Sequence, residues 1–527
     1  MRKLMFMMAF LIVALPAAAK DIYIAQRAAG AANGADCADA YAYTFFNTSA
    51  NWGAGASQIG PGTTVHICGT LTGAAGAAGL LTFQGSGTSG NPITLRFESG
   101  AIITAPFWGN GAIVAGTNSF IVIDGVCTAR DSAGRCTATQ GTIEASLAGS
   151  TGLTCLGGPC TDQPTSGVGL NAGNCSNCEV KNLTVEDMYM HSASIADAAG
   201  GGDGMWVGGT NTSADNNIIH DVHWGITGGF FSNESYFNNN LYNLDHGIAV
   251  LDSGVQTMSG LLIYNNLIRD FSNWDSAADT FHHDGIHVGD NSASTINPPW
   301  MIYNNYVYGD WGANDNTGIW TALNTPGSSA GVHYVFNNVF APASGSSCAN
   351  GAYSDDSFGT GPTVFNNTFA GIGCGILIGA NSATSAVVEN NIFDSGGAII
   401  DPVGGSTIST SNFNDFYNIV LSNQFRYSTF YNTLAAWNTA TGFDANSIST
   451  NPNLNATFIP NIGSPVIGFG VNFNSTCNGQ ANPGLGALCY DQAGVARPST
   501  GNWTMGAYTS SSVAGPTAPA NLTASVQ

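Results

Sequence analysis

The sequence is poor in charged residues, and above all in basic ones. Only 8% of its 527 residues are charged, against roughly 25% in an ordinary soluble domain, and 11 Lys and Arg stand against 33 Asp and Glu, a formal net charge of −22. A protein that binds nucleic acid needs a cationic surface to displace counterions from phosphates. The composition therefore excludes nucleic acid as an expected partner.

Long apolar segments are lacking as well. The apolar run at residues 4–15 is shorter than the ~20 residues of a membrane-spanning helix, and it lies between Arg2-Lys3 and Ala17-Ala18-Ala19. That order of charged start, apolar core and small residues is typical of a secretory signal peptide. We predict a signal peptide at 1–19, no membrane span in the mature chain, and secretion to the extracellular space, with the periplasm or the cell surface as alternatives.

Two common catalytic motifs are missing too, since the chain contains no H-E-x-x-H or P-loop sequence. Cysteine is present, with 12 residues in an exported chain, which favours disulfides but leaves their connectivity open. Cys175-x-x-Cys178 could instead be half of a zinc site, but no second C-x-x-C exists. The cysteines fall into sequence-near pairs: Cys37/Cys68, Cys127/Cys136, Cys155/Cys160, Cys175/Cys178, Cys348/Cys374 and Cys477/Cys489.

An internal repeat organises residues 216–393. Pairs of asparagines, each followed by strand-forming residues, recur there with insertions between them. A second element, a glycine followed by a short alternating apolar strand, lies between the pairs. The asparagine pairs are Asn216-Asn217, Asn239-Asn240, Asn265-Asn266, Asn304-Asn305, Asn337-Asn338, Asn366-Asn367 and Asn390-Asn391. The glycines are Gly204, Gly225, Gly247, Gly285, Gly318 and Gly375.

One such unit cannot bury its own apolar face, so equivalent strands of successive units must stack. Stacking also aligns the repeated asparagines, whose side-chain amides can then hydrogen-bond along the stack. The units lack segments of helical period and are too short for propeller blades of four strands and ~40 residues. The repeat therefore predicts an all-β fold, a parallel β-helix.

Three sequence phrases carry a family resemblance. The run of residues 85–95, GSGTSGNPITL, and the phrases SPVIG at 464–468 and RPSTGNWTMGAY at 497–508 resemble the opening and closing coils of secreted right-handed parallel β-helix proteins of the pectate-lyase-like superfamily. The resemblance covers roughly residues 80–508 and implies the fold. It implies no single chemistry, because the superfamily includes lyases, hydrolases, epimerases and adhesins.

This interpretation divides the chain into four parts. After the signal peptide, residues 20–80 are expected to form an N-terminal cap with the first coils, because an uncapped end would expose strand edges. Residues 81–510 are expected to form the right-handed parallel β-helix, and residues 511–527 a linker-like tail. We expect a monomer.

Histidine marks the candidate site. Six of the nine histidines, His220, His223, His246, His282, His283 and His287, lie between residues 220 and 287, a window that holds the longest insertion of the repeat. Six of the ten tryptophans lie in or beside it: Trp206, Trp224, Trp274, Trp300, Trp311 and Trp320. Insertions on one side of a repeat array commonly build the walls of a binding face.

Aligning the units on their glycines predicts which side chains meet. One column, just before the glycine, contains Asp203, Trp224, His246, Asp284 and Thr317; another, two residues after it, contains Trp206, Thr227, Ala249, His287 and Trp320. Asp245 and Asp284 come from adjacent coils and are the leading acid/base or nucleophile pair. Catalytic roles are therefore predicted for Asp245, Asp284, His246, His283 and His287.

Substrate contacts are predicted for Trp206, His223, Trp224, Trp320 and Arg269. The expected partner is a polysaccharide. No cofactor is required, although an acidic groove could recruit Ca²⁺ through Asp203 with Asp245 and Asp284. Zinc at His283 and His287 would need a third partner. The acidic pair Asp355-Asp356, set among Ser and Gly, is interpreted as a solvated turn.

Two reaction classes and one non-enzymatic class stay open. A lyase must neutralise a uronate carboxylate, and only Lys181 and Arg269 are basic near the cluster. A glycoside hydrolase acting on a neutral or weakly charged glycan avoids repulsion by this acidic chain. The alternative is a non-catalytic extracellular adhesin or structural β-helix, in which the histidines and aspartates only tie coils together.

Overall fold

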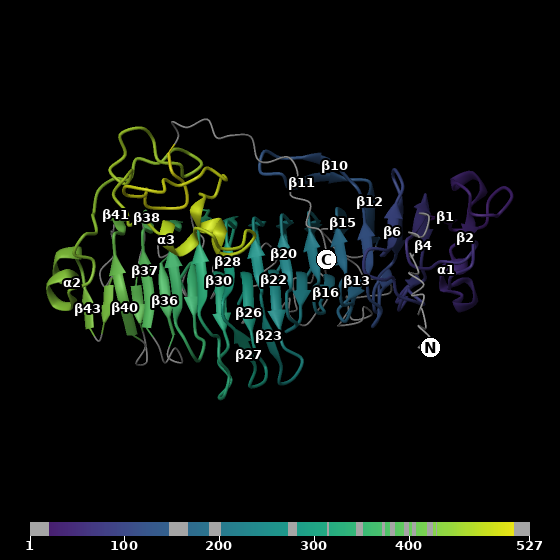
Figure 1. Ribbon diagram of the computed structural model, residues 1–527, viewed down its shortest axis with the longest axis horizontal. Helices are drawn as coiled ribbons and strands as arrows, with labels where there is room; N and C mark the ends of the chain where they lie inside the picture. The colour runs from purple at the N-terminus through teal and green to yellow at the C-terminus, as the bar shows by residue number, and fades with distance from the viewer. Residues whose placement is uncertain are drawn as a thin grey trace, which may run out of the picture.

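Three long parallel sheets run the length of the molecule, and successive coils add one strand to each (Figure 1). Residues 20–146, 167–188, 202–271, 282–312, 316–343, 351–371, 375–379, 385–394, 400–402, 407–418, 425–427 and 429–510 are described by the computed structural model. The predicted signal peptide and tail, Trp274, Cys155/Cys160 and Cys348/Cys374 lie outside them. The predicted class, an all-β right-handed parallel β-helix with an N-terminal cap, is confirmed.

The sheets are listed here in the order in which their strands pair. The 14-stranded sheet contains β2 (Tyr41–Ala42), β1 (Lys20–Ala25), β3 (Thr63–Cys68), β6 (Ile93–Phe97), β9 (Ile121–Asp124), β14 (Glu179–Lys181), β17 (Ser213–Asp215), β20 (Ser235–Phe237), β24 (Leu262–Tyr264), β28 (Trp300–Tyr303), β31 (His333–Phe336), β34 (Pro362–Phe365), β37 (Ser385–Glu389) and β40 (Thr407–Asn412). The 12-stranded sheet contains β4 (Thr70–Thr72), β7 (Ile102–Ala105), β12 (Gly141–Ala145), β15 (Leu183–Glu186), β18 (Ile218–His220), β21 (Asn240–Tyr242), β25 (Leu267–Arg269), β29 (Tyr306–Gly309), β32 (Val339–Pro342), β35 (Thr368–Ala370), β38 (Ile392–Asp394) and β41 (Asp415–Tyr417).

The 13-stranded sheet carries the candidate site. It contains β5 (Leu81–Thr82), β8 (Ile113–Val114), β13 (Val168–Ala172), β16 (Asp203–Val207), β19 (Trp224–Gly228), β22 (His246–Leu251), β26 (Asp284–Gly289), β30 (Thr317–Ala322), β33 (Tyr353–Asp355), β36 (Ile376–Ile378), β39 (Ile400–Pro402), β42 (Phe425–Tyr427) and β43 (Thr429–Tyr431). Two short ribbons lie outside these sheets, β10 (Cys127–Arg130) with β11 (Cys136–Thr139), and β23 (Thr257–Ser259) with β27 (Thr295–Asn297).

Helical elements are short and lie at the ends of the coils and in the C-terminal segment. They are η1 (Cys37–Asp39), α1 (Thr44–Asn47), η2 (Ser49–Asn51), α2 (Leu434–Thr441), α3 (Asn474–Cys477) and η4 (Leu485–Cys489). At the N-terminal end, Phe46 of α1 is buried against Trp52 and Phe83. At the other end, Trp437 of α2 is buried against Phe425. Both ends of the apolar core are thus covered.

A row of buried asparagines bonds successive coils together. In each pair the first asparagine turns the chain with a left-handed φ, as at Asn265 (56°) and Asn304 (56°), a conformation that asparagine tolerates better than most residues. The second is buried, and its side-chain amide donates to the carbonyl oxygen of the next one 3.0–3.2 Å away. The row contains Asn217, Asn239, Asn266, Asn305, Asn338, Asn367, Asn391 and Asn414.

This row corrects one repeat assignment and extends the prediction by one coil. The chain has three consecutive asparagines at 238–240, and the structure places Asn239 in the row and gives Asn238 the left-handed φ of 57°. Asn240 is already the first residue of β21 and pairs with Ile218. A pair was therefore assigned one residue too late, because a run of three identical residues offers two equivalent pairs. Asn414 lies beyond the pairs seen in the sequence, since Phe413 precedes it.

The repeated glycines are required by the spacing of the coils. A Cβ built on Gly247 would lie 2.3 Å from the carbonyl oxygen of Gly285, and one on Gly285 would lie 2.5 Å from that of Gly318. Real Cβ atoms do not come so close to backbone, so any side chain here would push neighbouring coils apart. The column runs through Gly169, Gly204, Gly225, Gly247, Gly285 and Gly318.

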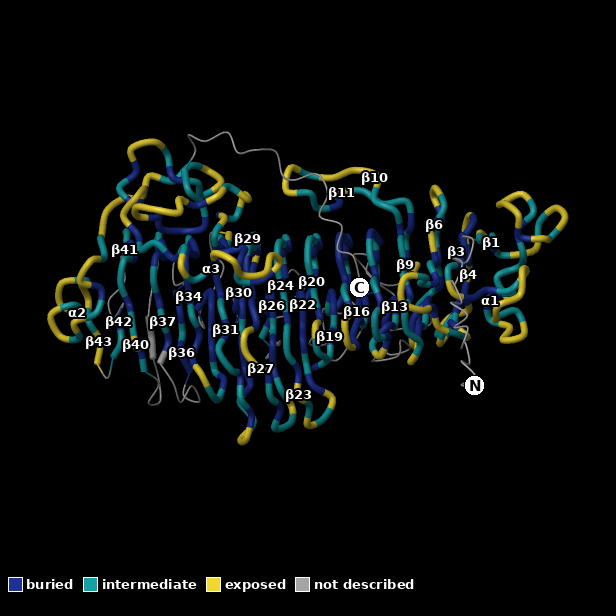
Figure 2. The backbone as a smooth tube through the Cα atoms, in the orientation of Figure 1, coloured by how far each residue is buried: buried dark blue, intermediate teal, exposed yellow. Residues whose placement is uncertain are grey.

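The C-terminal segment folds back over the helix instead of continuing it. The last strand of the long sheets ends at Tyr431, whereas the sequence prediction extended the coils to residue 510. Phe473 and Trp503 pack on Phe336 and Phe365 of the 14-stranded sheet. Figure 1 shows this segment in yellow above β28, and Figure 2 shows its exposed outer loops, while the strands beneath are largely buried.

Candidate functional site

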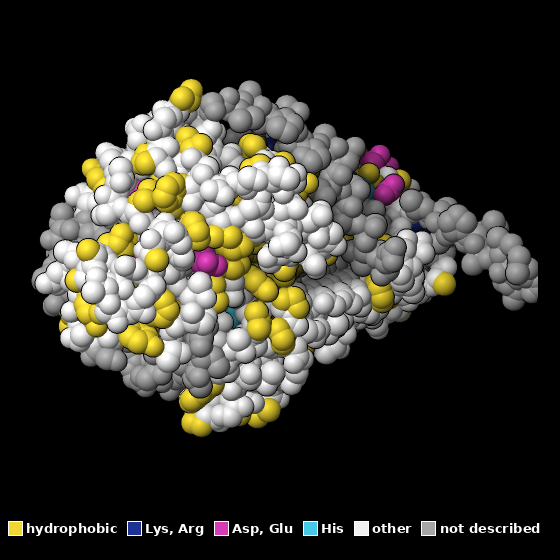
Figure 3. Space-filling view, turned by 60° about the vertical axis from the view of Figure 1, so that its left-hand side comes forward, with side chains coloured by type: hydrophobic (Ala, Val, Ile, Leu, Met, Phe, Trp, Pro, Cys, Tyr) yellow, Lys and Arg dark blue, Asp and Glu magenta, His cyan; other side chains and the backbone are white. Residues whose placement is uncertain are grey.

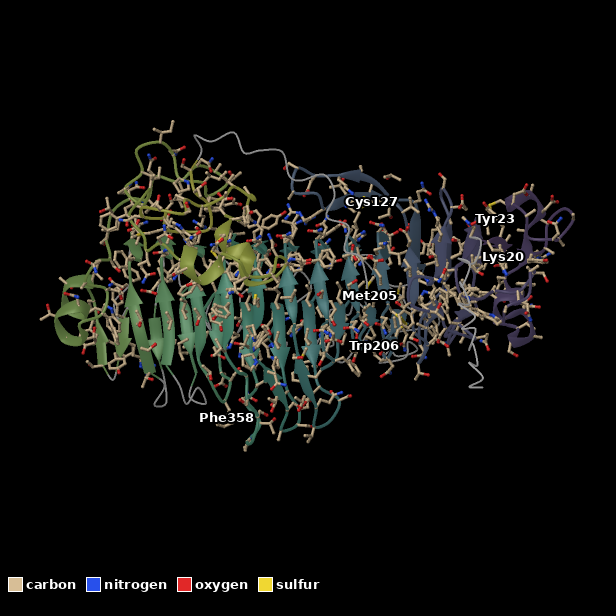
Figure 4. The ribbon with its side chains drawn as sticks, viewed as in Figure 1. Lys20, Tyr23, Cys127, Met205, Trp206 and Phe358 are labelled. Carbon is tan, nitrogen blue, oxygen red and sulfur yellow. A yellow bond between two sulfur atoms is a disulfide. The ribbon has the colours of Figure 1, made fainter. Side chains whose placement is uncertain are left out.

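Adjacent strands β16, β19, β22, β26 and β30 bring the predicted columns together. In the column before the glycine, Trp224 pairs with His246, His246 with Asp284, and Asp284 with Thr317. In the second column, the chain of pairs runs through Trp206, Thr227, Ala249, His287 and Trp320. The register predicted from the glycines is confirmed. Figure 4 labels Met205 and Trp206, neighbours on β16 of which Met205 is buried in the core and Trp206 half-buried.

Histidines and aspartates alternate along these coils in one continuous chain of contacts. Asp203 Oδ1 lies 3.3 Å from His223 Nδ1, and His223 Nε2 lies 3.2 Å from Asp245 Oδ2. The same Asp245 oxygen accepts from His246 Nδ1 at 3.0 Å, and His246 Nε2 lies 3.4 Å from Asp284 Oδ2. The imidazole of His246 thus lies between the two carboxylates of the predicted catalytic pair.

Two further histidines attach to this chain. His282 Nδ1 lies 2.8 Å from Asp284 Oδ2, and His283 Nδ1 contacts Asp245 Oδ1. Asp284 is completely buried and Asp245 is 5% exposed, whereas the His282 side chain is 35% exposed. The buried aspartates therefore bind the imidazoles from the protein interior, and His282 is the one of these two histidines that reaches solvent.

The carboxylates are strongly biased toward their ionised form. Burial alone would raise the pKa of Asp284, but hydrogen bonds and the charges of His246 and His282 hold it well below its ordinary value. Burial is likewise outweighed at Asp245, whose pKa is held well below its ordinary value by the charge of His246 and by hydrogen bonds from His223, His246 and His283. Both aspartates are therefore poor proton donors near neutral pH.

The histidines divide into two electrostatic classes. Burial opposes protonation of His223 and His246, yet their aspartate partners raise the pKa of His223 to about 10 and that of His246 to about 9. At His287 burial prevails, aided by the neighbouring His246 and His282, and its pKa falls to about 3 despite the nearby Asp284. A neutral imidazole therefore lies beside a row of charged ones, and neutral imidazole is the form that accepts a proton or binds a metal.

Aromatic rings fix the edges of the site. Trp224 Nε1 donates to Asp245 Oδ2 at 3.0 Å, and Trp206 Nε1 donates to Asp203 Oδ2 at 2.7 Å, so neither indole is free to rotate. The Trp320 ring stacks on His287 at 4.6 Å with an interplanar angle of 16°. The tryptophans that the sequence predicted at the ends of the columns are therefore held by the same aspartates and histidines that they flank.

A cavity of about 370 Å³ opens over β22, β26 and β30. Its floor and walls contain His223, Trp224, Asp245, His246, Leu251, His282, His287, Gly289, Asp290, Asn291, Trp320, Ala322 and Asn324. Figure 3 shows one face of the molecule on which a histidine appears in a hollow between hydrophobic side chains, with few charged side chains around it. The lining combines two indole rings and a few apolar residues with histidine, aspartate and asparagine side chains that can hydrogen-bond a polar ligand.

Not every predicted site residue lines this cavity. Trp206 and Asp203 lie one or two coils away and contact each other, while Asp284 and His283 lie beneath the floor. Arg269 belongs to β25 in the 12-stranded sheet, where it lies 4.1 Å over the Tyr242 ring and binds Asp270 at 2.6 Å. The structure does not bring Arg269 to this group, because the asparagine turn precedes its strand and directs it to another sheet.

Sequence reasoning also missed lining residues. His282 lies two residues before Asp284 and so outside the aligned columns, although its place in the histidine window was a usable signal. Asp290, Asn291 and Asn324 come from the ends of β26 and β30, where the repeat gives no register. Asp355, interpreted as a solvated turn, is in fact completely buried and accepts from Thr321 Oγ1 at 2.9 Å. An acidic residue among Ser and Gly gives no sign of such burial.

Disulfides are present at four of the predicted pairs, Cys37–Cys68, Cys127–Cys136, Cys175–Cys178 and Cys477–Cys489. Cys175 and Cys178 are bonded to each other, which excludes the zinc half-site considered for them. No described helix is both long and apolar enough to cross a membrane.

Comparison with known proteins finds distant similarity only. No family model and no curated protein matches the chain. Among solved structures, the pectate lyase Pel9A is similar with 12% identity and a TM-score of 0.40 over 93% of this chain and 96% of that one. A complex of XylC with xylose is similar with 11% identity and a TM-score of 0.41 over 93% and 98%. A tailspike protein of E. coli bacteriophage HK620 has 12% identity and a TM-score of 0.41 over 78% and 74%.

The fold is a right-handed parallel β-helix. Its own three long sheets, parallel except for the terminal strand β43, carry that statement. At such identities and TM-scores, no substrate and no residue role follows from the similar structures.

Proposed function

We propose that the cavity over β22, β26 and β30 binds a neutral or weakly charged polysaccharide outside the cytoplasm and hydrolyses it. The observation that carries the proposal is the cavity itself, in which indole faces at Trp224 and Trp320 flank a floor of imidazoles braced by carboxylates. Sugars present both apolar C–H faces and hydroxyl groups, and this lining offers a partner for each. The four disulfides support an oxidising compartment.

Hydrolysis is favoured over elimination by the charge of the lining. A lyase must neutralise the carboxylate of a uronate, which usually requires Lys, Arg or a cation. The described lining of the cavity contains neither Lys nor Arg and includes Asp245 and Asp290. The protonated imidazoles of His223 and His246 in this lining are already paired with Asp245, so they are poorly placed to neutralise a uronate, whereas a neutral glycan requires no such partner.

Roles follow from which side chains can reach a glycan. Asp245, His282 and His287 line the cavity and are assigned contact with the substrate. Asp284 and His283 lie beneath it and are assigned positioning roles, Asp284 for His246 and His282, and His283 for Asp245. A calcium role for Asp203 stays a prediction, and Asp203 lies outside the cavity lining.

The test is a panel of neutral and acidic polysaccharides incubated with the full chain, with reducing ends and the ultraviolet absorbance of unsaturated uronate followed together. We expect new reducing ends without absorbance, and their loss in Asp245→Asn. Asp131→Asn, which removes the charge partner of Arg135 in the turn between β10 and β11, is the matched control and should retain activity.

Three outcomes would contradict the proposal in different parts. Absorbance together with reducing ends would replace hydrolysis by elimination. Glycan binding without cleavage would favour the adhesin. Neither binding nor cleavage across a broad panel would overturn the polysaccharide assignment.

A further inference from the structure

Four metal-binding side chains converge at the floor of the cavity. His246 comes from β22, and His282, Asp284 and His287 come from β26 and the two residues before it. One donor atom from each of the four lies within 4.8 Å of every other. Adjacent parallel strands are about 4.8 Å apart, so two neighbouring coils suffice to build the group.

Two of these donor atoms are buried without a short hydrogen bond among the described residues. His246 is 3% exposed, and its Nε2 makes only a long contact of 3.4 Å, to Oδ2 of the completely buried Asp284. The Nδ1 atom of His287 is also buried and unbonded. Leaving a buried polar atom unpaired costs about 1–3 kcal/mol, so two such nitrogen atoms facing one carboxylate oxygen indicate that something else fills the space between them.

The surrounding residues hold the donors as the outer shell of a metal site does. His246 Nδ1 is bonded to Asp245 Oδ2 at 3.0 Å, which directs its Nε2 toward Asp284 and away from solvent. Metal-binding histidines usually bond their other nitrogen to a carboxylate in this way. Asp245 is itself held by Trp224 Nε1, and the His287 ring is held by stacking on Trp320.

We propose that His246, His282, Asp284 and His287 bind one divalent transition-metal ion, with Zn²⁺ as the representative ion. Three imidazole nitrogens and one carboxylate oxygen suit zinc and its neighbours, whereas Ca²⁺ takes six to eight oxygens. Zinc–nitrogen bonds of about 2.0–2.1 Å require the donors to move closer together than they are here. His282 can do so because its side chain is partly exposed.

The ion would face the cavity on one side. His246, His282 and His287 all line the cavity, whereas Asp284 lies behind them. A bound ion would therefore keep a position open toward the cavity for water or a glycan hydroxyl. This inference goes beyond the proposed function, and ion binding can be measured with no glycan present.

The experiment uses the full chain, treated with chelator and dialysed. Co²⁺ is titrated while visible absorption is recorded, and Zn²⁺ affinity is measured by competition with a chromophoric chelator. We expect one ion per chain, ligand-field bands typical of few-coordinate cobalt, displacement of Co²⁺ by Zn²⁺, and no competition by a large excess of Ca²⁺.

Variants locate the ion. His282→Ala and His287→Ala should each weaken Zn²⁺ binding at least tenfold. The matched control is His66→Gln, because His66 also lies between two carboxylates, 3.1 Å from Asp21 and 2.6 Å from Glu98, but on β3. Its affinity should equal that of the unaltered chain. Unfolding midpoints of all variants are measured alongside, so that loss of the site is distinguished from loss of the fold.

The proposal is overturned if no stoichiometric ion binds, if Ca²⁺ competes on equal terms, or if binding survives both histidine substitutions in folded protein. Because no glycan is used, each of these results leaves the polysaccharide proposal standing. Conversely, a negative glycan panel leaves the metal result intact.

Discussion

The asparagine row and the two columns of the candidate site, which lie before and after the repeated glycines, are both built by stacking equivalent positions of successive coils, but they serve different purposes. In the asparagine row, each coil from Asn217 to Asn414 presents the same residue, and each amide bonds to the next. In the site columns, every coil presents a different residue, so that aspartate, tryptophan and histidine meet across strands. The comparison shows two uses of equivalent positions in successive coils. Where the same residue recurs, its side chains bond the coils together. Where the residues differ, the fixed register brings unlike side chains into contact, as a reactive site requires.

The largest effect is expected within the asparagine row. In Asn239→Ala, the amide of Asn217 loses its acceptor, and the carbonyl oxygens of Asn266 and Ala214 lose a donor. Because all these atoms are buried, we expect the free energy of unfolding to fall by about 3–5 kcal/mol. Denaturant unfolding measures the loss.

Asn240→Ala is the control for this substitution. Asn240 is adjacent but outside the row, so its replacement should cost less than about 1 kcal/mol. Equal losses in the two variants would show that the row is not what holds the coils.

The next largest effect is expected at a glycine of the 13-stranded sheet. The added Cβ in Gly247→Ala would meet the carbonyl oxygen of Gly285 and force β22 away from β26. Overpacking of this kind typically costs about 1–3 kcal/mol, and it should also weaken Zn²⁺ binding, because His246 and Asp284 lie on those two strands. Unchanged stability and metal affinity in the same protein sample would contradict the close-approach account.

The pH dependence of stability tests whether a histidine between two carboxylates can have a purely structural role. His220 provides this test, because it lies outside the candidate site. His220 lies on the 12-stranded sheet, 3.0 Å from Glu186 and 2.5 Å from Asp221. Burial opposes its protonation, but hydrogen bonds to both carboxylates raise its pKa to about 9 from 6.5.

Because the folded-state pKa is the higher one, this stabilisation is complete below pH 6.5 and is lost as the pH rises through about 9. We expect a loss of about 1–2 kcal/mol over that interval, and His220→Gln should abolish it without affecting glycan cleavage. A pH-independent difference between the two proteins, or a loss of cleavage, would mean that His220 does not act as a purely structural cation.

The smallest effect is expected at the rim of the cavity. Trp320→Ala removes one indole face and should weaken oligosaccharide binding about tenfold, or about 1.4 kcal/mol. Isothermal titration measures the affinity. If affinity is unchanged while the unfolding free energy falls sharply, Trp320 serves the fold and not the ligand.

Much of the fold could be predicted because the repeat constrains it. A strand period of two and a glycine at one position of each coil determine register, and this register predicts that His246 lies beside Asp284. The pairing failed only at residues 238–240, where three identical asparagines leave the phase undetermined.

The candidate site could be predicted only in part, for a physical reason. Register predicts which residues are neighbours within a column of strand positions. It does not predict where residues beyond the strand ends lie, so His282 and Asp290, which flank β26, were missed. It also does not determine side-chain depth. Asp284 was predicted as a reacting carboxylate, yet it lies beneath the floor, because His246 and His282 cover it. Arg269 was assigned to the site because it is close to the histidines in sequence. Residues close in sequence can lie on different sheets, because each coil contributes strands to three of them.

The most direct test of the central claim compares one variant from the asparagine row with one variant from the candidate site. Unfolding free energy and glycan cleavage are determined side by side for Asn239→Ala and His282→Ala, under conditions in which both proteins are folded. The account predicts that Asn239→Ala loses stability and retains cleavage, while His282→Ala loses cleavage and changes stability by less than about 1 kcal/mol. The reverse pattern, with His282→Ala destabilised and fully active, would contradict it.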